Sequence, residues 1–276
     1  MILAKLRPFL ALAAATAALA PTHAQTAPGY YRFPAIHGDT VVFTAEGDLW
    51  RVAAGGGLAQ RLTTHAGQET LAAISPDGKL LAFSAQYEGP TEVYVMPLSG
   101  GLPVRLTYEG ENAQVRGWTP DGKVLYATRH FATLPDNQLV ALDPTTRRRT
   151  FLPLTQADEG VYDDDGRTLF FTRYGFQGSH AKRYAGGTAQ NLWRFTAGDK
   201  AAVQLFADYR GQSHWPMWWQ GRLYFASERD GTSNLWSSKP DGSDLRQHTH
   251  HADFGLKRPM QQGGRIVYQN GADIFL

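Results

Sequence analysis

The feature that most constrains this chain is a unit of about 45 residues that recurs along almost its whole length. A polar residue followed by two apolar residues returns six times, and a turn glycine that leads into an apolar strand returns in step with it. The copies of the three-residue element are Asp48-Leu49-Trp50, Glu92-Val93-Tyr94, Gln138-Leu139-Val140, Asn191-Leu192-Trp193, Asn234-Leu235-Trp236 and Asp273-Ile274-Phe275. Such a period is typical of folds built from repeated supersecondary units.

The unit 69–107 shows what each copy predicts. Strands are expected at 70–74, 80–85, 93–96 and 104–107, and the first two are joined by the turn Ser75-Pro76-Asp77-Gly78. The second and third strands are apolar on both faces, so we expect them inside a sheet that is covered on both sides. The fourth alternates between apolar and polar residues, as an outer strand does. Four strands per unit at this period predict an all-β, six-bladed β-propeller.

Two departures from the repeat stand out. Residues 174–190 form an insertion between the second and third strands of the fourth unit, and 130–136 form a shorter one in the third unit.

The sixth unit stops at Leu276 inside its third strand, so its outer strand is missing. An apolar strand with an unpaired edge is usually covered or interrupted by charges. We therefore expect the last blade to be incomplete and the chain to be a fragment that is C-terminally truncated.

The N-terminus predicts an exported protein. Lys5 and Arg7 precede an uncharged run at 9–20, and small residues at 21–24 offer a cleavage site, which is the layout of a secretory signal peptide. We assign 1–24 to the signal peptide and 25–276 to the propeller. Removing the two positive charges takes the net charge from +2 to 0, so no global field favours nucleic acid or a membrane as a partner. Periplasmic or secreted localisation is expected, with the cytoplasm as the alternative.

Clusters that resemble functional sites have plainer interpretations. His248, His250 and His251 follow an outer strand without a carboxylate or histidine partner at helical spacing, so we predict no metal site. The run Asp-Asp-Asp-Gly at 163–166 occupies the turn position of its unit and lacks the later glutamate of a calcium loop. The chain contains no cysteine and no nucleophile elbow. We predict no catalytic residue and no cofactor.

Five stretches resemble the N-terminal six-bladed propeller of tricorn proteases, and the resemblance covers the mature chain from end to end. The stretch KRYAGGTAQNLW distinguishes the tricorn family from other propellers, because turns of the SPDG type also occur in TolB-like propellers and in the propellers of prolyl-oligopeptidase relatives. The five are GYYRFPAIHGDTVVFTAEGDLWRV at 29–52, YEGPTEVYVMPLSGGLPVRLT at 87–107, GWTPDGK at 117–123, KRYAGGTAQNLW at 182–193 and YFASERDGTSNLW at 224–236.

The resemblance implies a part of a large serine peptidase that assembles into hexamers and cuts oligopeptides into very short products. In the family this propeller is followed by a second propeller, a PDZ-like domain and a catalytic domain, and none of these follows in the 276 residues. The catalytic serine, histidine and glutamate of the family therefore have no counterpart here. The implied function is a non-catalytic module that gates or guides peptide substrates or products. The alternative is a periplasmic TolB-like propeller that binds a protein partner without enzymatic activity.

Arg129 and His130 are the candidate peptide-binding pair. They lie at the end of the second strand of the third unit, where the repeat lapses. Members of the family resembled carry basic residues in roughly this place that anchor the C-termini of substrates. A guanidinium matches a carboxylate geometrically, whereas His130 stands where a second arginine would be and would bind in a pH-dependent way. The alternative interpretation is a solvated strand end.

Overall fold

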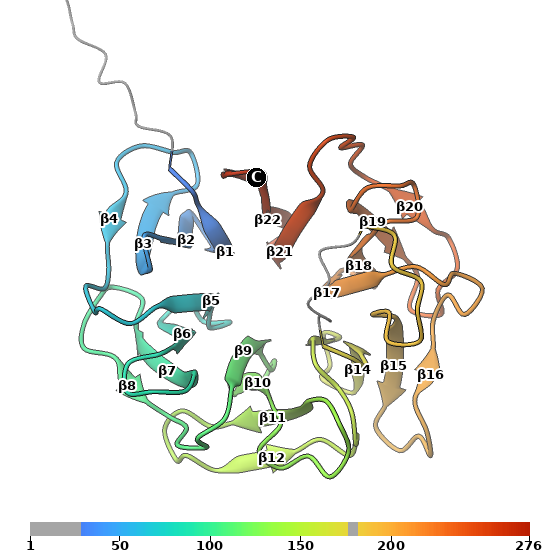
Figure 1. Cartoon of the computed structure of the whole chain (residues 1–276), viewed down its shortest axis with the longest axis horizontal. Helices are drawn as coiled ribbons and strands as arrows, with labels where there is room; N and C mark the ends of the chain where they lie inside the picture. Colours follow the sequence, from blue (N-terminus) through green and yellow to red (C-terminus); the bar gives the residue numbers. More distant parts are fainter. Residues whose placement is uncertain (1–28, 176–181) are drawn as a thin grey trace, which may run out of the picture.

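The fold is a ring of β-sheets arranged around a central axis (Figure 1). The computed structural model describes residues 29–175 and 182–276. The predicted signal peptide at 1–24 and part of the insertion at 174–190 lie outside the described residues, so the signal peptide stays a prediction. Within the described ranges, no helix is long and apolar enough to cross a membrane.

The described residues form 23 strands in six sheets. The first blade comprises β1 (Arg32–His37), β2 (Thr40–Ala45), β3 (Asp48–Ala53) and β4 (Gln60–Arg61), and the second β5 (Glu69–Ile74), β6 (Leu80–Ala85), β7 (Glu92–Pro97) and β8 (Val104–Arg105). The third comprises β9 (Ala113–Trp118), β10 (Val124–Thr128), β11 (Gln138–Leu142) and β12 (Arg149–Phe151), and the fourth β13 (Gly160–Tyr162), β14 (Thr168–Thr172), β15 (Leu192–Thr196) and β16 (Val203–Gln204). The fifth comprises β17 (Ser213–Trp219), β18 (Arg222–Ser227), β19 (Asn234–Ser238) and β20 (Arg246–Gln247), and the sixth β21 (Leu256–Gln262), β22 (Arg265–Asn270) and β23 (Asp273–Phe275).

Each blade is an antiparallel meander whose first strand lies nearest the axis (Figure 1). First strands contact one another around the ring, and β1 contacts both β5 and β21, which closes the circle between the first and last blades. Tyr31 adds a backbone bond across this seam, donating its N–H to Ala272 at 2.9 Å. The sixth sheet has three described strands. The predicted all-β, six-bladed propeller is confirmed.

The recurring polar residue at the start of the third strand has a structural role that the second blade shows. In the second blade, the Glu92 carboxylate accepts from Arg105 of β8 at 3.1 Å, and the neighbouring Val93 donates its N–H to Thr107 Oγ1 at 2.9 Å. These side chains continue the pairing of third and fourth strands where the backbone ladder ends. The predicted outer strand at 104–107 is therefore shorter than expected, because only Val104–Arg105 pair as strand. The same threonine bond, at 2.8 Å, joins Leu49 to Thr63 and Leu235 to Thr249.

The predicted turns between first and second strands are present. Gly78 has a positive φ of 72° and donates its N–H to the Ser75 carbonyl at 2.9 Å, which closes the turn. Gly166 makes the same bond to Asp163 at 3.2 Å, so the run of three aspartates is a turn, as predicted. The core lies between neighbouring blades, where second and third strands bury both faces. Leu81 and Phe83 of β6, for example, are fully buried.

Candidate functional site

The first strands carry a repeated irregularity that shapes the centre of the ring. A β-bulge interrupts the pairing of first and second strands in blades one, two, three, five and six. In the bulges of blades one, two, five and six a residue other than glycine adopts a left-handed backbone conformation, with φ between 49° and 54°. A bulge re-aims the side chain it carries. The four residues are Phe33, Leu71, Trp215 and Arg258.

These four side chains line one cavity at the axis, which we call the ring cavity. It has a volume of about 60 Å³, and the first strand of every blade contributes to it. Blades three and four add Arg116 and Gly160, and Glu159 lies directly before β13. The full lining is Phe33, Pro34, Leu71, Ala72, Ala73, Val115, Arg116, Glu159, Gly160, Trp215, Pro216, Arg258, Pro259 and Met260.

Two opposite charges face each other in the ring cavity without a direct hydrogen bond. Glu159 Oε1 lies 4.0 Å from Arg258 Nη1, and Glu159 Oε2 accepts a 2.7 Å bond from the backbone N–H of Trp215. Burial raises the pKa of Glu159, and burial with the nearby Arg116 charge lowers the pKa of Arg258. The guanidinium of Arg258 lies over two rings, 5.7 Å from the centre of Phe33 and 5.5 Å from that of Trp215. Such cation–π contacts hold the cation without neutralising it.

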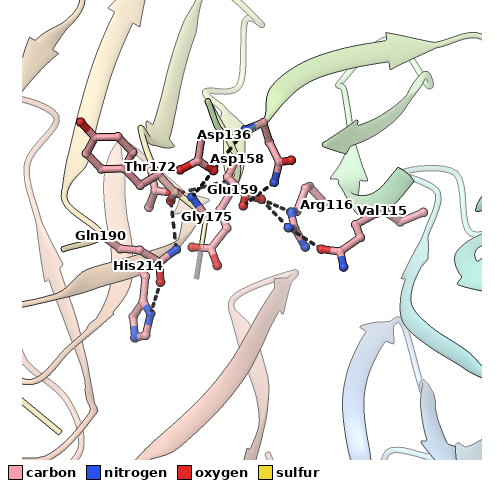
Figure 2. Close-up of polar contacts among 12 residues, drawn as sticks. Val115, Arg116, Asp136, Asp158, Glu159, Thr172, Gly175, Gln190 and His214 are labelled. Atoms are coloured by element: carbon pink, nitrogen blue, oxygen red, sulfur yellow. Dashed lines mark hydrogen bonds and ion pairs between the residues drawn. The ribbon is translucent and has the colours of Figure 1, made fainter. Parts of the chain in front are cut away.

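A second ion pair joins the third and fourth blades beside the ring cavity (Figure 2). Arg116 donates from Nε to the Asp158 carboxylate and from Nη2 to Gln114 Oε1 at 2.8 Å. Asp158 also accepts from Asn137 Nδ2 at 3.0 Å. A Cβ added at Gly175 would collide with Asp158 Oδ2, so the backbone after β14 packs directly on this carboxylate. The side chains of Arg116 and Asp158 are 7% and 2% exposed, which makes this a buried pair.

His214 lies on β17, directly before the cavity-lining Trp215, and Figure 2 shows it beside Gln190. Gln190 donates its amide N–H to the Tyr174 carbonyl at 3.3 Å, so its Oε1 is left to accept from His214 Nδ1 at 3.1 Å. The imidazole is therefore the neutral tautomer with hydrogen on Nδ1. Its ring stacks on Trp215 with the centres 3.9 Å apart. Burial, with the nearby Arg258 charge, lowers the pKa of His214 to about 3.

The sequence-predicted candidates lie elsewhere. Arg129 and His130 follow β10, are exposed, and do not line the ring cavity. Peptide binding by this pair stays a prediction. His248 bonds to Ser237 at 2.8 Å and His251 to Tyr268 at 3.1 Å, so these histidines have structural partners. Within residues 29–175 and 182–276, no group of three or more histidine, aspartate or glutamate side chains is arranged to hold a metal ion.

The ring-cavity residues were missed because most of them lie within the first strand of a repeat, where the sequence pattern resembles that of a core strand. A signal for them does exist in the sequence. The dipeptides Phe33-Pro34, Trp215-Pro216 and Arg258-Pro259 recur at the same position of their units. Proline has no N–H to give to a sheet and is found there at edges and bulges. A proline that returns in step with the repeat thus marks the bulge, and the residue before it faces the axis.

Comparison with known proteins agrees with the fold. The family described as "Tricorn protease N-terminal beta propeller domain" matches residues 28–276. Tricorn protease homolog 1 of Streptomyces coelicolor is 37% identical over 251 residues, which make up 90% of this chain and 23% of that protein. A crystal structure of the tricorn protease aligns with a TM-score of 0.80 and 25% identity, over 90% of this chain and 25% of that one.

A structure of putative TolB from Agrobacterium tumefaciens aligns with a TM-score of 0.65 and 20% identity, over 80% of this chain and 81% of that one. At that identity the likeness shows the fold alone. The chain spans about a quarter of the length of the tricorn relatives. Since the family match and the 37% identical relative both extend across the propeller, this chain belongs to the tricorn protease N-terminal beta propeller domain family.

Proposed function

We propose that this chain is the non-catalytic propeller module of a serine protease that degrades oligopeptides to short peptides, and that peptides pass through its channel. The family match over residues 28–276 carries this proposal. The ring cavity supports it, because every blade contributes to a cavity at the axis that is lined by both charged and apolar residues. Such a lining suits the mixed chemistry of peptides. Self-association into a hexamer, which the resemblance implies, stays a prediction.

Obstructing the channel is expected to slow peptide hydrolysis by the complete gene product that carries this chain. Leu71 lines the ring cavity, and the chain has no native cysteine, so Leu71→Cys places a single thiol of this domain at the axis. Coupling a bulky maleimide to it should lower the steady-state rate on an oligopeptide at least about fivefold, because passage becomes limiting. A small methylthio adduct on the same thiol should have little effect.

The matched control is Leu58→Cys, on a loop of the first blade where Leu58 is 92% exposed. The bulky adduct there should leave the rate unchanged. Equal rates for the two bulky adducts, after complete modification is verified by mass, would contradict passage through this channel. A complete gene product without any peptidase activity, or a reading frame that encodes no peptidase domain, would favour the TolB-like binding function instead.

We also propose that the protein is exported. The charges of Lys5 and Arg7, the uncharged run at 9–20 and the small residues at 21–24 support a cleaved signal peptide. Mass spectrometry of the protein from its native host is expected to find a mature N-terminus at Gln25 in the periplasmic or extracellular fraction. An intact Met1 in the soluble cytoplasmic fraction would overturn export.

A further inference from the structure

Two residues that line the ring cavity carry buried hydrogen-bond donors without an acceptor among the described residues. Nη1 of Arg116 has no partner among the described residues, although its side chain is 93% buried and its other nitrogens are bonded. The indole Nε1–H of Trp215 likewise has no partner within residues 29–175 and 182–276. Both residues line the cavity. A buried donor left unpaired is costly, so these two groups indicate an acceptor that is supplied from outside the chain.

The charges around the cavity balance, which restricts the ligand. Arg116 is neutralised by Asp158, and Arg258 faces Glu159 at 4.0 Å. A ligand with net charge would leave an uncompensated charge in this partly enclosed site. A zwitterion would not, and its two ends match what is present. Its anionic end can accept from the donors on Arg116 and Trp215, and its cationic end can bond to the Glu159 carboxylate, which Arg258 does not reach directly.

The volume and the apolar lining of the ring cavity further restrict which ligands can bind. A volume of about 60 Å³ is room for roughly four to six water molecules. That space is large enough for a single amino acid. Phe33, Leu71 and Met260 supply an apolar wall, so the side chain of the ligand should be apolar as well.

We propose that the ring cavity binds a free apolar α-amino acid. Arg116 Nη1 and Trp215 Nε1 donate to its carboxylate, Glu159 accepts from its ammonium group, and Phe33, Leu71 and Met260 pack against its side chain. The proposal concerns this chain alone and holds whether or not the complete protein is a peptidase. If peptides do pass through the channel, a bound amino acid lies on the axis and obstructs them.

The test is calorimetric titration of the full chain with L-leucine, 3-methylbutylamine and 4-methylpentanoate. 3-Methylbutylamine lacks the carboxylate and 4-methylpentanoate lacks the ammonium group, while both keep the apolar side chain. L-leucine is expected to bind, and each analogue should bind about tenfold more weakly, because each leaves one polar anchor unpaired. No heat of binding with L-leucine up to about 10 mM, or equal affinity for all three compounds, would overturn the proposal.

Two variants test which residue binds which end of the ligand. Glu159→Gln keeps an acceptor for the Trp215 backbone N–H and removes the negative charge. It should therefore weaken the binding of L-leucine about tenfold and leave the binding of 4-methylpentanoate unchanged. Trp215→Phe keeps an aromatic ring and removes the indole N–H. It should weaken the binding of L-leucine and of 4-methylpentanoate about fivefold without changing that of 3-methylbutylamine. Glu111→Gln, at an exposed position before β9, is the matched control and should change nothing. Unchanged affinity for L-leucine in a folded Glu159→Gln protein would overturn the proposal.

Discussion

Replacing Asp158 with alanine is expected to lower the free energy of unfolding by about 3–5 kcal/mol, because the change leaves the Arg116 cation buried without its partner. Arg116 would keep only the 2.8 Å bond from its Nη2 to Gln114. Asn137 would lose its acceptor as well. The pair joins the third and fourth blades, so the change weakens the contact between two blades and does not disrupt the pairing within one sheet. Urea unfolding followed by circular dichroism measures the effect.

Two controls separate the buried charge from the general effect of losing a carboxylate. Glu88→Ala removes an exposed partner that lies 2.7 Å from Arg105, and it should cost no more than about 1 kcal/mol. The double variant Arg116→Met with Asp158→Ala removes both buried charges and should recover at least half of the loss, since an apolar pair carries no desolvation cost. A loss below about 1 kcal/mol for Asp158→Ala alone would contradict the assignment of this pair as buried and structural.

The blades could be predicted from the sequence because their determinants are local. Strands such as β6 are apolar on both faces, and turns such as 75–78 use residues whose backbone preferences are known. The repeat then fixes the number of blades without any long-range information. The short outer strands were harder, because Thr107 replaces a backbone acceptor with a side chain and that exchange leaves no mark on the apolar pattern.

The centre of the ring could not be predicted in the same way. Whether Trp215 and Arg258 face the axis depends on bulges in two different blades, and their meeting with Glu159 depends on closure of the whole ring. Sequence reasoning instead favoured Arg129 and His130, because the repeat lapses there. A lapse in a repeat marks a loop, whereas a residue on the axis obeys the repeat. In a propeller, candidate channel residues are therefore better sought at equivalent positions of the first strands.

Acidification is expected to destabilise the protein through His214. Its pKa is about 3 in the fold and about 6.5 in an unfolded chain, so the unfolded state takes up the proton first as the pH falls. Because the folded pKa is the lower one, stability decreases with falling pH from about 6.5 down to about 3. Between pH 6.5 and 4.5 this single group should remove about 2 kcal/mol. The cause is visible in the structure, since a proton on Nε2 would meet no acceptor among the described residues.

The decisive measurement is a difference between two proteins, because other groups titrate in the same range. Burial raises the pKa of Glu159, and that shift has the opposite sign, since a group with a raised folded pKa recovers stability as the pH falls. His214→Phe keeps the stacking on Trp215 and leaves Glu159 in place. Its urea-unfolding free energy should therefore fall by about 2 kcal/mol less than that of the parent between pH 6.5 and 4.5, and His250→Phe, at an exposed position, should follow the parent. If the unfolding free energies of His214→Phe and the parent change in parallel with pH, the prediction is wrong. That result would show that His214 is protonated in the folded protein as readily as in the unfolded chain, and that water reaches its side chain.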